Sequence, residues 1–369
     1  MDYFKNYTSN TSAGSGNQKY FLTCDEIQTG RIFYRVNCGG EYKYSFLLSN
    51  IVDSTFSDGK ESHANFVCDQ WEILSLHAGI CKGDFFGRSF DPVKKYDIQH
   101  ACNMKQILFN GQKSKTVAPG EFFSTDAVLL NAQTDDYICV EISFRGKQIP
   151  FLCECNIPAF KKTGDNWVFS SEMPFIGMLG CNRSVKKRIA FLGDSITQGL
   201  GTPINSYAHW NAIISKSLGS DYAFWNLGLG FGRASDAASD GAWLFKAKQN
   251  DAVVVCYGVN DIFQGCTEQE LKANLKNITK SLHNCGVKVL LQTIPPFNYK
   301  QEHKRIWSEV NRYIMNDLAD VADAIFDVVP ILSVGGNTPE DALYGDHPNE
   351  EGCKKWAQAL LPVLWNFIK

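Results

Sequence analysis

A serine with the surroundings of a nucleophile lies in residues 186–199, KKRIAFLGDSITQG. The apolar run 188–192 predicts a short strand, and Gly193-Asp194-Ser195 predicts a turn that leads into a helix. Open α/β sheets carry their sites at the C-terminal ends of strands, and a helix N-terminus favours negative charge. Ser195 is therefore a candidate nucleophile. The same three residues are also ordinary helix-capping chemistry, so the interpretation depends on residues further along the chain.

Three later turns carry the chemistry that a serine nucleophile needs. They are residues 226–232 (NLGLGFG), 258–261 (GVND) and 345–349 (GDHPN). A serine is a weak nucleophile until a base takes its proton, and histidine suits that task near neutral pH. His347 is the candidate base, because the other histidines of this half fall within or beside predicted helices.

The same turns offer donors for an oxyanion. The Ser195 N–H, one N–H of the glycine-rich loop and the Asn260 side-chain amide can supply three. Removing one such donor typically costs about 2.7–4 kcal/mol of barrier. The loop contains Gly230, Phe231 and Gly232, and among these Gly230 is our candidate. Together these residues predict a hydrolase site.

The elements that would position these turns alternate regularly in the C-terminal half. The strand-like runs are almost continuously apolar, as in Ala252-Val-Val-Val-Cys256, which is typical of a parallel sheet buried on both faces. Five strand–helix units predict a doubly wound, flavodoxin-like α/β domain of three layers. The predicted strands are 188–192, 223–227, 252–257, 287–293 and 324–328, and the predicted helices are 206–218, 234–248, 268–284, 304–318 and 351–368.

The N-terminal half has the pattern of an all-β domain. Short strand-like runs separated by Gly, Asn, Asp and Ser predict a β-sandwich or jelly roll, with no catalytic constellation of its own. We therefore expect two domains, residues 1–185 and 186–369. The predicted strands are 31–36, 41–48, 105–109, 115–117, 127–130, 137–144 and 150–155.

Composition narrows the range of partners and locations. The 369 residues include 36 basic and 39 acidic ones, well mixed, for a net charge of −3, which argues against nucleic acid or an anionic membrane as the main partner. No secretory signal or membrane-spanning stretch is seen, so we expect a cytoplasmic protein. The 13 cysteines are scattered, and we expect them to be reduced and mostly buried, with no metal site.

The four turns together resemble the blocks of the SGNH (GDSL) hydrolases, whose key residues are Ser, Gly, Asn and His. Residues 193–199 resemble the first block, 226–232 the second, 258–261 the third and 347–349 the fourth. The N-terminal half more loosely resembles the jelly-roll domain that precedes the catalytic domain in some carbohydrate-directed esterases of this group. The resemblance implies hydrolysis of acyl esters through a serine acyl-enzyme, without metal or cofactor.

The sequence departs from the family pattern at two positions. An Asp usually lies three residues before the histidine and orients it, but here that position is Tyr344. Asp346 is adjacent to the histidine, Asp341 could reach it only if the loop folds back, and a backbone carbonyl is a third possible orienting group. The second departure is Phe231, which stands where the family usually has Gly.

The expected activity is removal of a small acyl group, acetyl in particular, from a small-molecule or oligosaccharide ester. Phe231, Phe263 and Tyr344 are bulky residues that could close an acyl pocket. Lipase, lysophospholipase and thioesterase activities use the same chemistry and stay open. A carbohydrate-binding protein with a degenerate site is the alternative from another class, motivated by the missing Asp. The first domain could cover one side of the site or form a homodimer interface.

Overall fold

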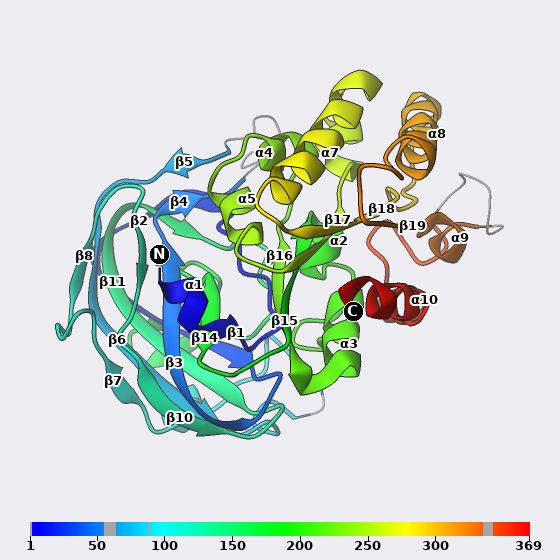
Figure 1. The fold of residues 1–369 in the computed structure, drawn as a ribbon. Coiled ribbons are helices and arrows are strands. Elements are labelled where there is room, and N and C mark those ends of the chain that lie inside the picture. The colour runs from blue at the N-terminus through cyan, green and yellow to red at the C-terminus, as the bar shows by residue number, and fades with distance from the viewer. Residues whose placement is uncertain (1, 55–63, 88, 335–341) are drawn as a thin grey trace.

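Two kinds of sheet divide the chain, as Figure 1 shows. The computed structural model describes residues 2–54, 64–87, 89–334 and 342–369. Antiparallel strands occupy the N-terminal half up to Cys181, and a parallel sheet begins at Lys187. The predicted β-sandwich and flavodoxin-like domains are therefore confirmed as architectures. The domain boundary at 185/186 stays a prediction that agrees with this change of sheet.

The parallel sheet has the strand order β16-β15-β17-β18-β19, in which the first strand along the chain lies between the second and the third. This is the flavodoxin-like order. Its strands are largely buried because their sequences are mostly apolar, and every residue of the central strand β17 is buried. The strands are β15 (Lys187–Gly193), β16 (Tyr222–Gly228), β17 (Ala252–Cys256), β18 (Lys288–Gln292) and β19 (Ala324–Phe326).

Helices cover both faces of this sheet (Figure 1). On one face α3 packs against α10, where the buried rings of Trp210 and Trp356 stack with centroids 4.7 Å apart. On the other face lie α4, α5, α7 and α8. The helices are α2 (Ser195–Gln198), α3 (Trp210–Leu218), α4 (Ala234–Ala238), α5 (Ala242–Ala247), α6 (Val259–Phe263), α7 (Glu268–His283), α8 (Gln301–Asn316), α9 (Val329–Leu332) and α10 (Glu350–Ile368), with a 3-10 turn at Gly219–Asp221.

One predicted helix is wrong in its continuity. Residues 234–248 form two helices, α4 and α5, separated by residues 239–241. Asp240 has a φ of 58°, the left-handed conformation that ends a helix. An Asp-Gly pair is a turn signal, and here it outweighs the helical pattern on either side.

The N-terminal half is a sandwich of two mainly antiparallel sheets. One has the order β1-β14-β3-β10 with β9 paired to β3, and the other has the order β13-β12-β2-β11-β6-β7 with β8 paired to β6. The strands are β1 (Thr8–Ser9), β2 (Lys19–Arg35), β3 (Gly40–Ser49), β4 (Ile51–Val52), β5 (Phe66–Val67), β6 (Trp71–Cys81), β7 (Lys105–Ile107), β8 (Lys115–Val117), β9 (Phe122–Ser124), β10 (Val128–Ala132), β11 (Tyr137–Phe151), β12 (Ala159–Thr163), β13 (Asn166–Phe169) and β14 (Met178–Cys181), with α1 (Tyr3–Asn6) and a 3-10 turn at Ile98–His100.

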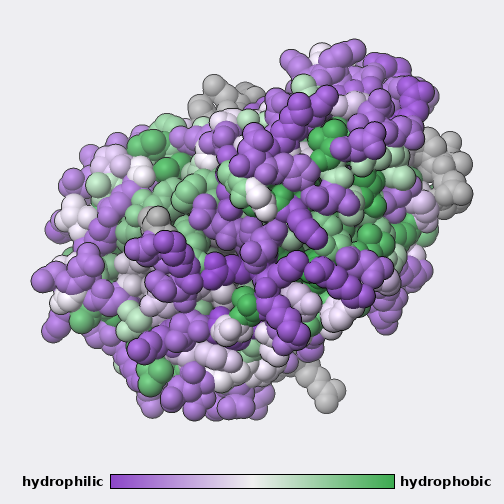
Figure 2. All heavy atoms as spheres, in the orientation of Figure 1, coloured by the Kyte–Doolittle hydropathy of each residue, from purple (hydrophilic) through white to green (hydrophobic). Residues whose placement is uncertain are grey.

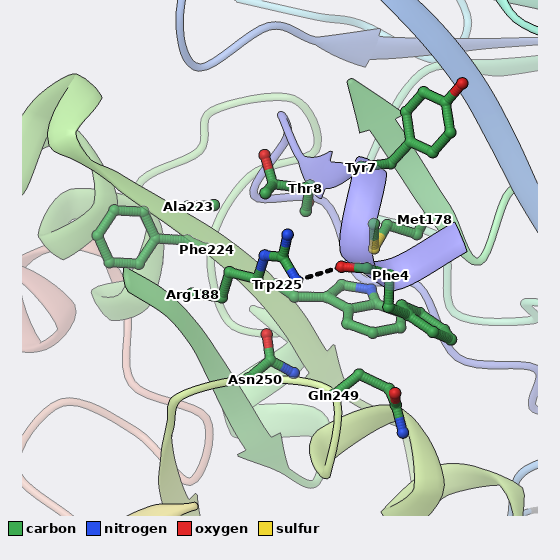
Figure 3. A pocket seen from close by; sticks show the side chains of 11 residues that line it. Phe4, Tyr7, Thr8, Met178, Arg188, Ala223, Phe224, Trp225, Gln249 and Asn250 are labelled. Carbon is green, nitrogen blue, oxygen red and sulfur yellow. Dashed lines mark hydrogen bonds between the residues drawn. The ribbon is translucent and has the colours of Figure 1, made fainter. Parts of the chain in front are cut away.

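Helix α1, near the N-terminus, packs beside the edge strand β16 of the parallel sheet. The ring of Phe4, in α1, lies 5.9 Å from that of Trp225 on the edge strand β16, and Arg188 donates a hydrogen bond to the Phe4 carbonyl (Figure 3). Trp225 Nε1 in turn donates to the Gly177 carbonyl at 2.9 Å. The cavity left between these side chains is about 10 Å³, close to the room for one water. An exposed sheet edge invites pairing with other chains, and this packing covers it.

A buried ion pair also joins the two halves. Lys246 Nζ on α5 lies 2.6 Å from Asp53 Oδ2, which follows β4, and both side chains are almost fully buried. The Asn17 N–H donates to the same carboxylate oxygen at 2.8 Å. Charges this deep are tolerated only when paired.

The surface of the face seen in Figure 2 is mixed, with hydrophobic residues in small groups between hydrophilic ones. None of the helices that the structure describes has the length and apolarity needed to cross a bilayer. All 13 cysteines are free thiols and seven of them are buried, which agrees with the expectation that most are buried.

Asp53→Asn is expected to lower the free energy of unfolding by about 3–5 kcal/mol, because Lys246 would stay buried without its counter-charge. The measurement is urea unfolding followed by tryptophan fluorescence. The matched control is Lys216→Met, which breaks an exposed pair between the same two halves, Lys216–Asp135 at 3.5 Å. It should change stability far less. Equal losses in the two variants would contradict a dominant role for the buried pair.

Candidate active site

The candidate nucleophile lies where β15 turns into α2. Asp194 caps this turn by accepting the Ile196 N–H at 3.0 Å. Ser195 is the first residue of the helix, so its own N–H has no intrahelical acceptor. Its Oγ lies 2.8 Å from Nε2 of His347, 152 residues further along the chain. The structure thus brings together the serine and the histidine that the sequence singled out.

Helix α2 has only four residues, and its free carbonyls are met by side chains from elsewhere. Helices this short are not stable alone, and the last carbonyls of any helix lack intrahelical partners. Asn211 on α3, Asn226 on β16 and Asn156 of the N-terminal half donate to the carbonyls of residues 197, 198 and 199, respectively. The nucleophile is therefore held by three amides that come from three separate elements.

His347 lies on the loop that precedes α10. Burial lowers the pKa of His347, and the nearby negative charge of Asp346 opposes this shift. A lowered pKa keeps the imidazole neutral at neutral pH, as a general base must be. The ring of Phe297 lies edge-on to the imidazole, with centroids 5.9 Å apart.

The position three residues before His347, where the family pattern has an orienting Asp, is Tyr344 in this chain. Asp346 Oδ1 accepts the Asn298 N–H at 2.9 Å. At the Nδ1 atom of His347, the structure records no hydrogen bond within the described ranges. Asp341 lies outside the described residues. The role of Asp346 as third member of a triad therefore stays a prediction.

The glycine-rich loop after β16 is tied to the nucleophile turn. The Leu229 N–H donates to the Gly193 carbonyl at 3.0 Å, and the Gly232 N–H turns back to the Leu229 carbonyl at 3.0 Å. Asn260 Nδ2 donates to the Gly232 carbonyl at 3.0 Å, which leaves the second amide hydrogen of Asn260 available. The Gly230 N–H makes no recorded hydrogen bond to a described residue. Gly230 and Asn260 therefore stay the candidate oxyanion donors beside Ser195.

Phe231 has a left-handed backbone, with a φ of 59°. This conformation disfavours residues with a Cβ and is normally left to glycine. The family resemblance places a glycine at this position. The loop thus keeps a glycine-like shape with a phenylalanine in it, and the side chain is 39% exposed.

Glu154 of the N-terminal half borders the site, which the sequence did not indicate. A Cβ on Gly230 would lie 1.9 Å from Glu154 Oε2, so the carboxylate approaches this loop because residue 230 has no side chain. Gln18 holds Glu154 through two hydrogen bonds, from its Nε2 to Oε2 at 3.3 Å and from the Glu154 N–H to its Oε1 at 3.1 Å. Burial raises the pKa of Glu154. No motif marks a residue that reaches the site from so far away in the chain.

The predicted pocket residues lie in different surroundings. Phe263 is 42% exposed, and its ring lies 5.1 Å from that of Phe297 and 5.4 Å from that of Tyr299. Tyr344 instead hydrogen-bonds Lys355 on α10 through its hydroxyl. Sequence reasoning missed Phe297, although its place after β18, at the same sheet edge as the other turns, was a usable signal. The pocket roles of Phe231, Phe263 and Tyr344 stay predictions.

Two buried carboxyl groups, those of Asp194 and Asp261, accept backbone N–H groups at the starts of α2 and α4. Burial raises the pKa of Asp194 to about 7 and that of Asp261 to about 6. Asp261 accepts the N–H groups of Ala234 and Ser235, at 2.8 and 3.3 Å, and so fixes the start of α4 beside the glycine-rich loop. Both carboxyls are occupied with backbone groups.

The arrangement offers a hydroxyl, a neutral base in contact with it, and N–H donors on adjoining turns. These groups suit attack on a carbonyl carbon followed by stabilisation of the oxyanion. In the part of the chain that the structure describes, no three His, Cys, Asp or Glu side chains gather as a metal site.

Comparisons with known proteins agree with this chemistry. Residues 191–355 match the model of the GDSL-like lipase/acylhydrolase family. No curated protein matches the chain.

The chain is similar to several solved structures. A family two carbohydrate esterase from Clostridium thermocellum, solved with cellohexaose, has 13% identity, covers 98% of each chain and has a TM-score of 0.41. A member of the lipolytic protein G-D-S-L family from Veillonella parvula has 19% identity, covers 48% of this chain and 98% of its own, and has a TM-score of 0.40. An acetyl-xylooligosaccharide esterase from Geobacillus has 16% identity, covers 49% of this chain and 94% of its own, and has a TM-score of 0.39. Because these TM-scores are low, the family assignment of residues 191–355 rests on the match to the family model.

Asp346→Asn is expected to lower the pKa of His347 further, because it removes the negative charge that opposes the effect of burial. The measurement is NMR titration of the imidazole, whose midpoint in the wild type should lie below its ordinary value of 6.5. Asp97→Asn is the control, since Asp97 contacts His100 and should leave the His347 midpoint unchanged. An upward shift in Asp346→Asn would contradict the assignment of these charges.

Proposed function

We propose that this chain, whose residues 191–355 form a domain of the GDSL-like lipase/acylhydrolase family, removes small acyl groups, acetyl in particular, from carbohydrate esters. The family makes the chain a hydrolase that acts on ester bonds. The identities of the nucleophile, the base, the acyl group and the alcohol are our proposal.

The observation that carries the mechanism is the contact between Ser195 Oγ and His347 Nε2 at 2.8 Å. This distance is that of a hydrogen bond through which a proton can pass. The lowered pKa of His347 favours the neutral imidazole, which is the form that can accept the proton of Ser195.

The proposed reaction has two steps. In the first, Ser195 Oγ attacks the ester carbonyl carbon while His347 Nε2 takes its proton, and the proton then passes to the departing alcohol. In the second, His347 takes a proton from water, the hydroxide attacks the acyl-enzyme, and Ser195 leaves with the proton restored. The Ser195 and Gly230 N–H groups and the Asn260 amide would hold the oxyanion in both steps.

The preference for a small acyl group is supported by the aromatic residues beside the base. Phe297 packs edge-on against His347, and Phe263 and Tyr299 pack behind it. Aromatic side chains this close leave less room for a long acyl chain. We therefore expect esters of long acyl chains to be poorer substrates than acetyl esters.

The carbohydrate part is supported by the first domain. Its resemblance is to the domain that precedes the catalytic domain in carbohydrate-directed esterases, and it brings the polar side chains of Gln18 and Glu154 to the glycine-rich loop. Amide and carboxylate groups are the side chains that recognise hydroxyl-rich ligands by hydrogen bonding.

The deciding experiment is hydrolysis of p-nitrophenyl esters of increasing acyl length by the wild type and Ser195→Ala. We expect the acetate to have the highest kcat/KM and the variant to lose activity by at least about a thousandfold. A preference for long acyl chains would favour the lipase, lysophospholipase or thioesterase alternatives. An inactive wild type would favour a carbohydrate-binding protein with a degenerate site.

Asn260→Ala is expected to lower kcat by about a hundred- to a thousandfold, which is the usual effect of removing one oxyanion donor. The measurement is steady-state hydrolysis of p-nitrophenyl acetate, with KM changing little because the donor acts on the transition state. Asn284→Ala, at the end of α7, is the matched control and should keep full activity. A kcat within about threefold of the wild type would remove Asn260 from the oxyanion hole.

A further inference from the structure

A short segment of the N-terminal half, residues 153–156, lies against the nucleophile helix. The backbone carbonyl of Glu154 accepts a hydrogen bond from Gln198 Nε2 at 2.6 Å, and Gln198 is the last residue of α2. Asn156 Nδ2 donates to the Gly199 carbonyl at 2.9 Å. The backbone of this segment is thereby fixed relative to Ser195, and so is the start of the Glu154 side chain.

The Glu154 carboxylate ends at the proposed oxyanion loop. Its Oε2 lies 1.9 Å from the position that a Cβ of residue 230 would take, and the missing side chain of Gly230 is what gives it room. The carboxylate is half-buried, and of the described residues Gln18 alone hydrogen-bonds it, at a long 3.3 Å. An ionised carboxylate has about four acceptor positions. Most of its acceptor positions are therefore not taken by the described residues, beside the loop that we propose holds the oxyanion.

We propose that Glu154 is a specificity-determining residue, whose carboxylate accepts hydrogen bonds from hydroxyl groups of the alcohol part of the ester. The inference rests on the proposed esterase function and assigns recognition of the alcohol part to one residue. Esters of polyhydroxylated alcohols become better substrates than esters of alcohols without hydroxyl groups.

The chemistry favours a neutral hydroxylated ligand. Hydrogen bonds to an ionised acceptor are about twice as strong as neutral ones, and a half-buried carboxylate has lost part of the water that would otherwise solvate it. A hydroxyl from the substrate replaces that water. An anionic substituent at this position would be repelled by the like charge.

The test compares one variant on two acetyl esters. Glu154→Gln keeps the shape of the side chain and removes its charge. We expect kcat/KM for a methyl xyloside carrying one acetyl group and free hydroxyls to fall about tenfold or more, and kcat/KM for p-nitrophenyl acetate to stay within about threefold. Glu172→Gln, an exposed glutamate of the same half paired with Lys161, controls for loss of a negative charge and should change neither value.

The other outcomes overturn the inference in distinguishable ways. Equal losses on both esters would mean that the Glu154 side chain supports the glycine-rich loop and does not recognise the alcohol, because the contact with α2 is made by its backbone carbonyl, which the substitution keeps. Gln198→Leu, which removes the contact with the Glu154 backbone carbonyl, supplies the reference pattern for a general structural loosening of α2. No loss on either ester would remove Glu154 from substrate recognition. Turnover of p-nitrophenyl acetate by the wild type, and its loss in Ser195→Ala, tests the proposed function itself and does not depend on the ratio between the two esters.

Discussion

The site depends on how a four-residue helix is held in place. Alone, α2 would not form, and its close seat against β16 requires Gly228, where a Cβ would lie 2.0 Å from the Gln198 nitrogen. The free carbonyls at its end are met by amides of Asn211, Asn226 and Asn156. Because Asn156 belongs to the N-terminal half, the position of Ser195 is set by both halves of the chain. The first domain is therefore part of the structure that holds the nucleophile.

The contacts between the halves make this arrangement a fixed one. Phe4 and the Gly177 carbonyl cover Trp225 on the edge strand β16, and the buried Lys246–Asp53 pair joins the halves at a second place. Separating the halves would expose an apolar sheet edge and two charges at once, and both steps are costly. A domain attached in this way is suited to shaping one side of a cleft. A tethered targeting module would need far fewer buried contacts.

The sequence predicted the parallel sheet and the four turns well, because apolar runs mark buried strands and the C-terminal ends of parallel strands share an edge. In the N-terminal half it did not predict several strands, β6, β9, β12, β13 and β14 among them, or the full lengths of β2 and β11. The first part of β2, residues 19–28, has many exposed positions and so lacks a continuous apolar run. It belongs to the sheet because it pairs with β11. The break at Asp240 was missed because a turn signal lay inside a helical pattern. Glu154 was beyond prediction, since only the tertiary fold brings it to Gly230.

The glycine-rich loop meets two constraints at neighbouring positions. Residue 231 has the left-handed backbone that normally requires glycine, yet it is Phe231, whereas residue 230 must be glycine to admit the Glu154 carboxylate. A negative charge beside an oxyanion loop opposes the charge that develops in the reaction. The Gln18 amide donates to the carboxylate, which reduces that opposition. Further donors from a hydroxylated substrate would reduce it again, so recognition of the alcohol and stabilisation of the oxyanion become linked through one side chain.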